Sequence, residues 1–195
     1  MLKPKHFTLA LYCTRHSTHI YEFVFAYDGQ NLIKYGQLPS LEDIAGADIR
    51  KYQKMLPPGY FGELKRATGL ASHGIGIGAF VYLRRIFEKM IHQHHDIMIE
   101  RGNKIVEFAT MRMDDRIAEL KDVLPSALVE NKAAYGILSK GIHELDEATC
   151  QRYFPVVRQA IIAILEQDYQ QQKQEEQAVN LRNAIAEAAG EVKEI

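Results

Sequence analysis

The sequence has few cysteines, almost no net charge and no long hydrophobic run. Its 195 residues include two cysteines, Cys13 and Cys150. Two cysteines cannot form the disulfide framework of a small secreted protein, so they indicate a reducing, cytoplasmic location. The net charge of −1 excludes the overall basic surface that nucleic-acid-binding domains often carry. No apolar run approaches the roughly twenty residues of a membrane-spanning helix, so we expect no membrane partner.

Residues 1–38 predict a small antiparallel β meander. Between His19 and Tyr27, large aromatic side chains alternate with other residues, and this period of two is typical of a strand. Asp28-Gly29 follows as a turn signal, and 31–35 can return as a further strand. A similar alternation over 7–13 predicts the strand before it.

Residues 39–170 predict a helical bundle, so the expected fold class is α+β, mainly α. The longest helical signal runs from His73 to Glu100, and its apolar residues recur at steps of three and four. They are Phe80, Leu83, Phe87, Met90 and Ile91. Arg84 and Glu88 lie four residues apart, the spacing at which opposite charges meet on a helix surface. We expect Leu83 and Phe87 in the core and Arg84 partly exposed.

The C-terminal stretch 171–195 is rich in Gln, Glu and Ala and has only a thin apolar stripe. That stripe contains Val179, Leu181 and Ile185. We expect a helical or frayed tail, which either extends the last long helix into solvent or pairs with a partner helix.

Three patterns resemble ligand sites, but each is incomplete or has a structural explanation, so we predict no metal and no small-molecule cofactor. Gly74, Gly76 and Gly78 precede a helix, but no strand comes before them, so close approach of another helix competes with phosphate binding. The spacings that could hold zinc lack a full set of four ligands. They are Cys13, His16 and His19 near the N-terminus, and His92, His94 and His95 near the end of the long helix. We expect those last three to lie at a solvated helix end.

Four segments together resemble the HEPN superfamily of helical domains. They read AFVYLRRIFEKMI, DDRIAELKDVLPSAL, YGILSKGIHELDEATCQRYF and VVRQAIIAILE. The resemblance covers about 79–165 and is closest to a divergent bacterial branch whose bundle opens with an LRR-x-x-E helix. It implies an antiparallel helical bundle that forms homodimers. Active members of the superfamily are metal-independent endoribonucleases that use an arginine four to six residues before a histidine.

His143 matches the family's histidine, but no arginine stands at the matching distance before it. Arg84 or Arg85, on the neighbouring helix, could supply the cation for RNA cleavage, with His143 as the base and Glu88 beside them. We predict that Lys140 or His143 lies within reach of Glu88. The structural alternative is that Arg84, Arg85 and Glu88 form an ion-pair network at a helix interface.

Two functions therefore remain open. The first is a non-catalytic, HEPN-like dimerising module that binds a protein or RNA in a bacterial nucleic-acid-linked or antiviral defence system. The second is a HEPN-type endoribonuclease of a toxin–antitoxin or defence system. The missing arginine favours the first.

Overall fold

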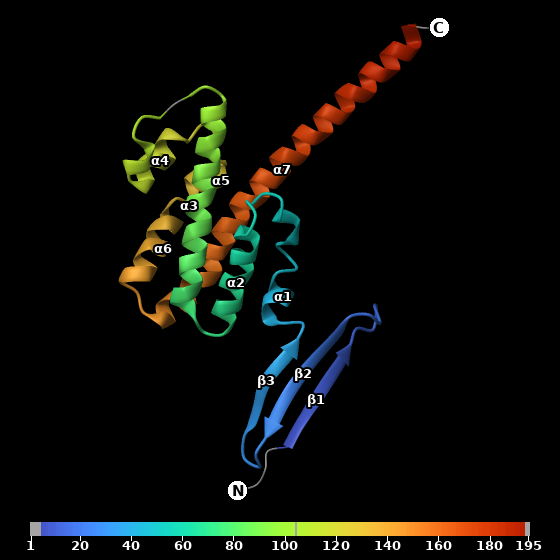
Figure 1. Ribbon diagram of the computed structural model, residues 1–195, viewed down its shortest axis with the longest axis vertical. Helices are drawn as coiled ribbons and strands as arrows, with labels where there is room; N and C mark the ends of the chain where they lie inside the picture. Colours follow the sequence, from blue (N-terminus) through green and yellow to red (C-terminus); the bar gives the residue numbers. More distant parts are fainter. Residues whose placement is uncertain (1–4, 104, 194–195) are drawn as a thin grey trace. The chain divides into compact units, whose positions relative to one another are not determined.

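The computed structural model describes residues 5–103 and 105–193, and these fall into two units, Met1–Asp48 and Ile49–Ile195. The first unit contains a β-sheet and the second contains the long helices, so the predicted α+β, mainly α class is confirmed (Figure 1). The division falls later than the expected boundary after residue 38, because the short helix α1 (Leu41–Ala45) groups with the sheet.

The first unit is a three-stranded antiparallel sheet in the order β1-β2-β3. Its strands are β1 (Lys5–Tyr12), β2 (Ile20–Tyr27) and β3 (Leu32–Leu38). In the register, Phe7 pairs with Phe25, and their rings stack with centroids 5.4 Å apart. Between β2 and β3 the Asp28 carboxylate accepts hydrogen bonds from the backbone N–H groups of Gln30 and Asn31. The predicted meander is therefore observed.

The second unit consists of helices of very different lengths. They are η1 (Arg50–Tyr52), α2 (Tyr60–Ser72), α3 (Gly76–Glu100), η2 (Phe108–Thr110), α4 (Met113–Glu119), α5 (Ser126–Glu130), α6 (Ala133–His143) and α7 (Glu147–Lys193). Helix α3 packs against α2, α6 and α7. The five residues of its predicted stripe are all buried, and Arg84 is partly exposed as expected.

Two glycines permit the closest helix contacts in the second unit. A Cβ atom at Gly76 would lie 2.5 Å from the backbone nitrogen of Gln151, so only glycine allows α7 to come this close to α3. A Cβ atom at Gly141 would lie 2.1 Å from the ring of buried Phe80. Since Gly141 meets Phe80 and Tyr135 meets Phe87, helix α6 runs antiparallel to α3.

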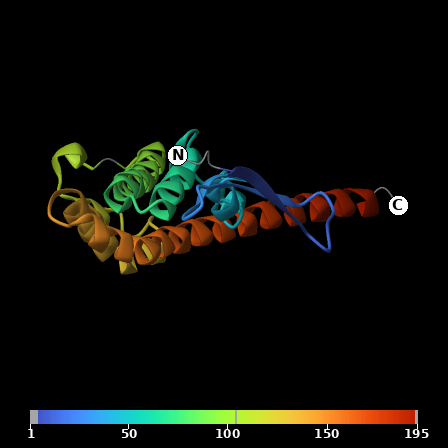
Figure 2. The ribbon, with the colours of Figure 1, turned by 90° about the horizontal axis from the view of Figure 1, so that it is seen from below.

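Helix α7 has two halves in different surroundings. Its first half supplies core residues, among them Cys150, Phe154, Ile161 and Leu165. From Gln170 to Gly190 every residue is exposed, and the helix continues past the other helices of its unit (Figures 1 and 2). Among the described residues, no helix combines the length and the apolar character needed to cross a bilayer.

Candidate functional site

Arg84, Glu88 and Tyr135 form a closed polar cluster between α3 and α6. The Arg84 Nε atom lies 2.9 Å from Glu88 Oε1, one helical turn further along α3. Tyr135, from the first turns of α6, donates its hydroxyl to the same carboxylate oxygen at 2.9 Å. That hydroxyl also accepts a hydrogen bond from Arg84 Nη2 at 3.1 Å. The expected ion pair of Arg84 with Glu88 is therefore observed at this helix interface, but Tyr135 joins it and Arg85 does not.

The surroundings of this cluster raise the pKa of both hydrogen-bond donors, Tyr135 and Arg84. Burial, with the hydrogen bond to Glu88 as the next cause, raises the pKa of Tyr135, so its hydroxyl stays protonated and keeps donating. The hydrogen bond to Glu88 raises the pKa of Arg84 above its already high value. Arg84 is therefore a permanent cation whose hydrogen-bond donors point at neighbours within its own unit. This arrangement ties α6 to α3.

Arg85 points to a different neighbour. Its Nη2 atom lies 2.8 Å from Oε1 of Glu63, a mostly buried carboxylate on α2. The other carboxylate oxygen of Glu63 is buried with no hydrogen-bond partner among the described residues. Arg84 and Arg85 thus connect α3 to α6 and to α2, respectively, and the structure does not bring them together at one site. Glu63 could not be predicted as the partner of Arg85, because no local spacing links the two residues.

His143 is the exposed last residue of α6. It lies eight residues after Tyr135, which is about 12 Å along the helix axis at 1.5 Å per residue. Because α6 runs antiparallel to α3, that end lies beside the first turns of α3, away from Arg84. Lys140 or His143 was expected to reach Glu88. In the structure the residue of α6 that contacts Glu88 is Tyr135.

The glycine-rich start of α3 is occupied by α7. Glu147 accepts a hydrogen bond from the backbone N–H of Ile77 at 3.2 Å, and the α7 backbone packs on Gly76. A carboxylate thus uses the N-terminal N–H group that a phosphate would need. Of the two readings of this motif, close helix approach is the one observed, at Gly76.

The histidines of α3 do not lie at a solvated helix end as expected. His95 stacks on Phe108 with centroids 3.8 Å apart, and His92 meets the same ring edge-on. The guanidinium of Arg116 lies 5.2 Å from the centre of that ring. Burial, followed by the charge of Arg116, lowers the pKa of His92. In the part of the chain that the structure describes, no three His, Cys, Asp or Glu side chains are placed to hold a metal ion.

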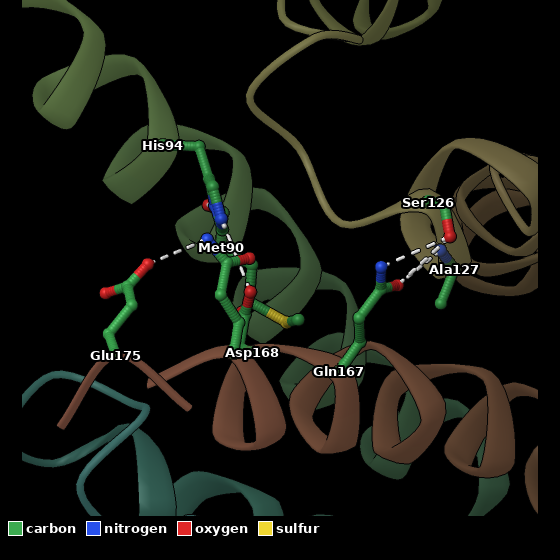
Figure 3. A network of polar contacts seen from close by, with 8 residues as sticks. Met90, His94, Ser126, Ala127, Gln167, Asp168 and Glu175 are labelled. Atoms are coloured by element: carbon green, nitrogen blue, oxygen red, sulfur yellow. Dashed lines mark hydrogen bonds and ion pairs between the residues drawn. The ribbon is translucent and has the colours of Figure 1, made fainter. Parts of the chain in front are cut away.

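Two contacts of α7 were missed by sequence analysis (Figure 3). His94 lies 3.5 Å from the Asp168 carboxylate, and its other ring nitrogen lies 2.8 Å from the Met90 carbonyl oxygen. The neighbouring Gln167 turns to α5, where its side-chain oxygen accepts the backbone N–H of Ala127 at 2.8 Å. These contacts join residues 40 or more positions apart in the chain, so no spacing rule could have found them.

A third polar contact fixes α7 to η1. Glu166 accepts hydrogen bonds from Lys51, at 2.6 Å, and from the hydroxyl of Tyr52. The hydrogen bond from Lys51 is the main cause that lowers the pKa of Glu166 to about 2. Together with Asp168 and Gln167, Glu166 holds α7 in place directly before its exposed half begins.

An apolar groove lies along the surface of α7. It has a volume of about 710 Å³. Its walls are Ala133, Ala134 and Ile137 of α6 and Val156, Ala160 and Ala163 of α7, with Glu130 of α5 at its edge. The side chain of Val156 is 64% exposed, so nothing in the described chain covers the groove at that point.

Comparison with family models, with curated proteins and with solved structures finds no match for this chain. The resemblance to the HEPN superfamily therefore stays a prediction.

Proposed function

We propose that the helical unit is a non-catalytic dimerising module, the role that the HEPN resemblance implies for an inactive member. The observation that carries this proposal is the exposed half of α7. A helix of this composition without tertiary contacts is only marginally stable in water, so a continuous helix from Gln170 onward favours a partner that covers it.

The geometry of the charged residues supports a non-catalytic role over the endoribonuclease alternative. RNA cleavage would need a base and a cation at one place. In this structure Arg84 is paired with Glu88 of its own helix and Arg85 with Glu63 of α2, and His143 is the last residue of α6. The resemblance also suggests a protein or an RNA as a further partner and a role in bacterial defence. The composition supports a cytoplasmic location.

Sedimentation equilibrium of the full chain tests the proposal. We expect a dimer at tens of micromolar, and a monomer for a chain that ends at Gln171, which keeps all contacts of Gln167 and Asp168. A full chain that stays monomeric over this range would overturn the proposal.

A second measurement separates the two functions. Labelled RNA is incubated with the protein with and without chelator, and intact RNA is the expected result. Chelator-resistant cleavage that His143→Ala abolishes would replace the proposed module by the endoribonuclease.

A further inference from the structure

The exposed half of α7 and the apolar groove lie on the same face of one helix. Ala178 and Leu181 follow Ala160 and Ala163 by 18 residues, which is about five turns at 3.6 residues per turn. Ile185 follows Ala160 by 25 residues, or about seven turns. Leu181 and Ile185 are 62% and 59% exposed. An exposed apolar stripe therefore continues from the groove along the rest of α7.

The stripe is symmetric about its middle. In the groove its residues follow one another by four and then three positions (Val156, Ala160, Ala163). In the exposed half they follow by three and then four positions (Ala178, Leu181, Ile185). If two copies of α7 lie antiparallel with a two-fold axis between Gln170 and Gln171, then Leu181 faces Ala160 and Ile185 faces Val156. In the same register, Ala178 faces Ala163. Each large exposed side chain thus meets a small residue or a groove wall, which is the arrangement of an isologous interface.

We propose that a second copy of this chain occupies the groove: each α7 places its exposed half, through Leu181 and Ile185, in the α6–α7 groove of the other copy. This inference rests on the proposed function and names the surface through which the two copies would bind. From Gln170 to Gly190 the helix is about 30 Å long, and the two-fold axis forms this contact twice. A stable dimer buries about 800 Å² per partner, and the two-fold axis doubles the area that one such contact contributes.

Charge at the edge of the groove agrees with this occupant. Arg182 follows Leu181 at the edge of the stripe, and Glu130 stands at the edge of the groove. Both are exposed in the single chain. In the antiparallel register Arg182 faces Gln159 of the other copy, which lines the same groove as Glu130, so opposite charges come to the same groove.

The first test uses substitutions along α7 with sedimentation equilibrium as the readout. Leu181→Glu and Val156→Glu should each weaken the dimer at least tenfold, since each places a charge in the same contact. Val179→Glu is the matched control, because Val179 is also apolar and 51% exposed. It lies on the other side of the helix from Leu181, so it does not belong to the stripe in which it was expected. A dimer that Val156→Glu leaves unchanged would overturn the inference.

The second test fixes the register by cross-linking. In a Cys13→Ser background, Ala160→Cys and Leu181→Cys are combined, and mild oxidation should give a disulfide-linked dimer. Within one chain these positions lie about 30 Å apart along α7, so the bridge can form only between copies. Ala160→Cys with Val179→Cys is the control and should not cross-link.

The outcomes distinguish the inference from the proposed function. A dimer without the 160–181 bridge overturns the inference and leaves the dimerising module in place. A dimer that Leu181→Cys alone cross-links would show a parallel coiled coil instead. A chain that stays monomeric overturns both and leaves a different protein as the occupant of the groove. Restoration of a weakened Arg182→Glu dimer by Glu130→Arg would confirm the charged contact.

Discussion

Tyr135 joins two helices through a single hydroxyl group. That hydroxyl donates to Glu88 and accepts from Arg84, while the ring packs against Phe87. The spacing of Arg84 and Glu88 predicted their pairing, but nothing in the sequence linked Tyr135 to them. The combination depends on how α6 is placed along α3, and that placement is a long-range property of the packing.

Tyr135→Phe should lower the free energy of unfolding by about 1 kcal/mol, because it removes both hydrogen bonds and keeps the ring. The loss is moderate, since Arg84 and Glu88 remain paired and partly exposed to water. Denaturant unfolding followed by far-UV circular dichroism measures it. Tyr153→Phe, which removes a hydroxyl that accepts a hydrogen bond from exposed Arg152, should change the value by less than about 0.5 kcal/mol. Equal effects of the two substitutions would contradict the structural role of the cluster.

His94 makes the stability of α7 depend on pH. Burial lowers the pKa of His94, but Asp168 and the Met90 carbonyl outweigh burial, so the net pKa is raised. The folded protein then binds the proton more tightly than the unfolded chain. This stabilisation is complete below the unfolded pKa of about 6.5 and is lost as the pH rises through the raised folded pKa.

His94→Gln should therefore reduce the free energy of unfolding more at about pH 5 than at about pH 9. Unfolding curves of the original chain and the variant at both pH values give the two differences. Asp168→Asn removes the main opposite charge near His94. It should therefore also reduce the free energy of unfolding more at about pH 5 than at about pH 9. A loss that is equal at both pH values would show that His94 contributes by packing alone.

Helix α6 packs closely on α3 because Gly141 has no side chain. Gly141→Ala would drive a methyl group into the buried ring of Phe80 and should cost about 1–3 kcal/mol. Gly136→Ala, on the same helix with open space around it, should stabilise by about 0.5–1 kcal/mol through helix propensity. The midpoints of chemical unfolding measure both. Stabilisation by both substitutions would show that the helices do not approach as described.

At the level of elements, the sequence predicted the features that depend on neighbouring residues, such as the buried face of a helix. The period of α3 predicted its buried face. Ser40 accepts the Asp43 N–H at the start of α1, as serine commonly does at a helix N-cap. Asp146 likewise accepts the N–H of Thr149 at the start of α7. The position of His143 could not be predicted, because Gly141 and Phe80, 61 residues apart, set the register of α6.

For the whole molecule, the core of the described chain is formed by residues from Ile49 onward. A chain without residues 1–48 should therefore keep a folded helical unit that unfolds cooperatively. Far-UV circular dichroism during thermal unfolding of the shortened and the full chains provides the comparison. A shortened chain without cooperative helical unfolding would show that residues 1–48 are needed for the bundle.

One continuous helix, α7, carries both the core of the unit and the exposed apolar stripe. Any partner that binds the stripe therefore binds only the folded chain, and mass action then makes stability a function of protein concentration. Diluting the protein tenfold should lower its melting temperature, while the chain that ends at Gln171 should melt at one temperature at every dilution. The abundance of this protein would in that way determine what fraction of its copies is folded.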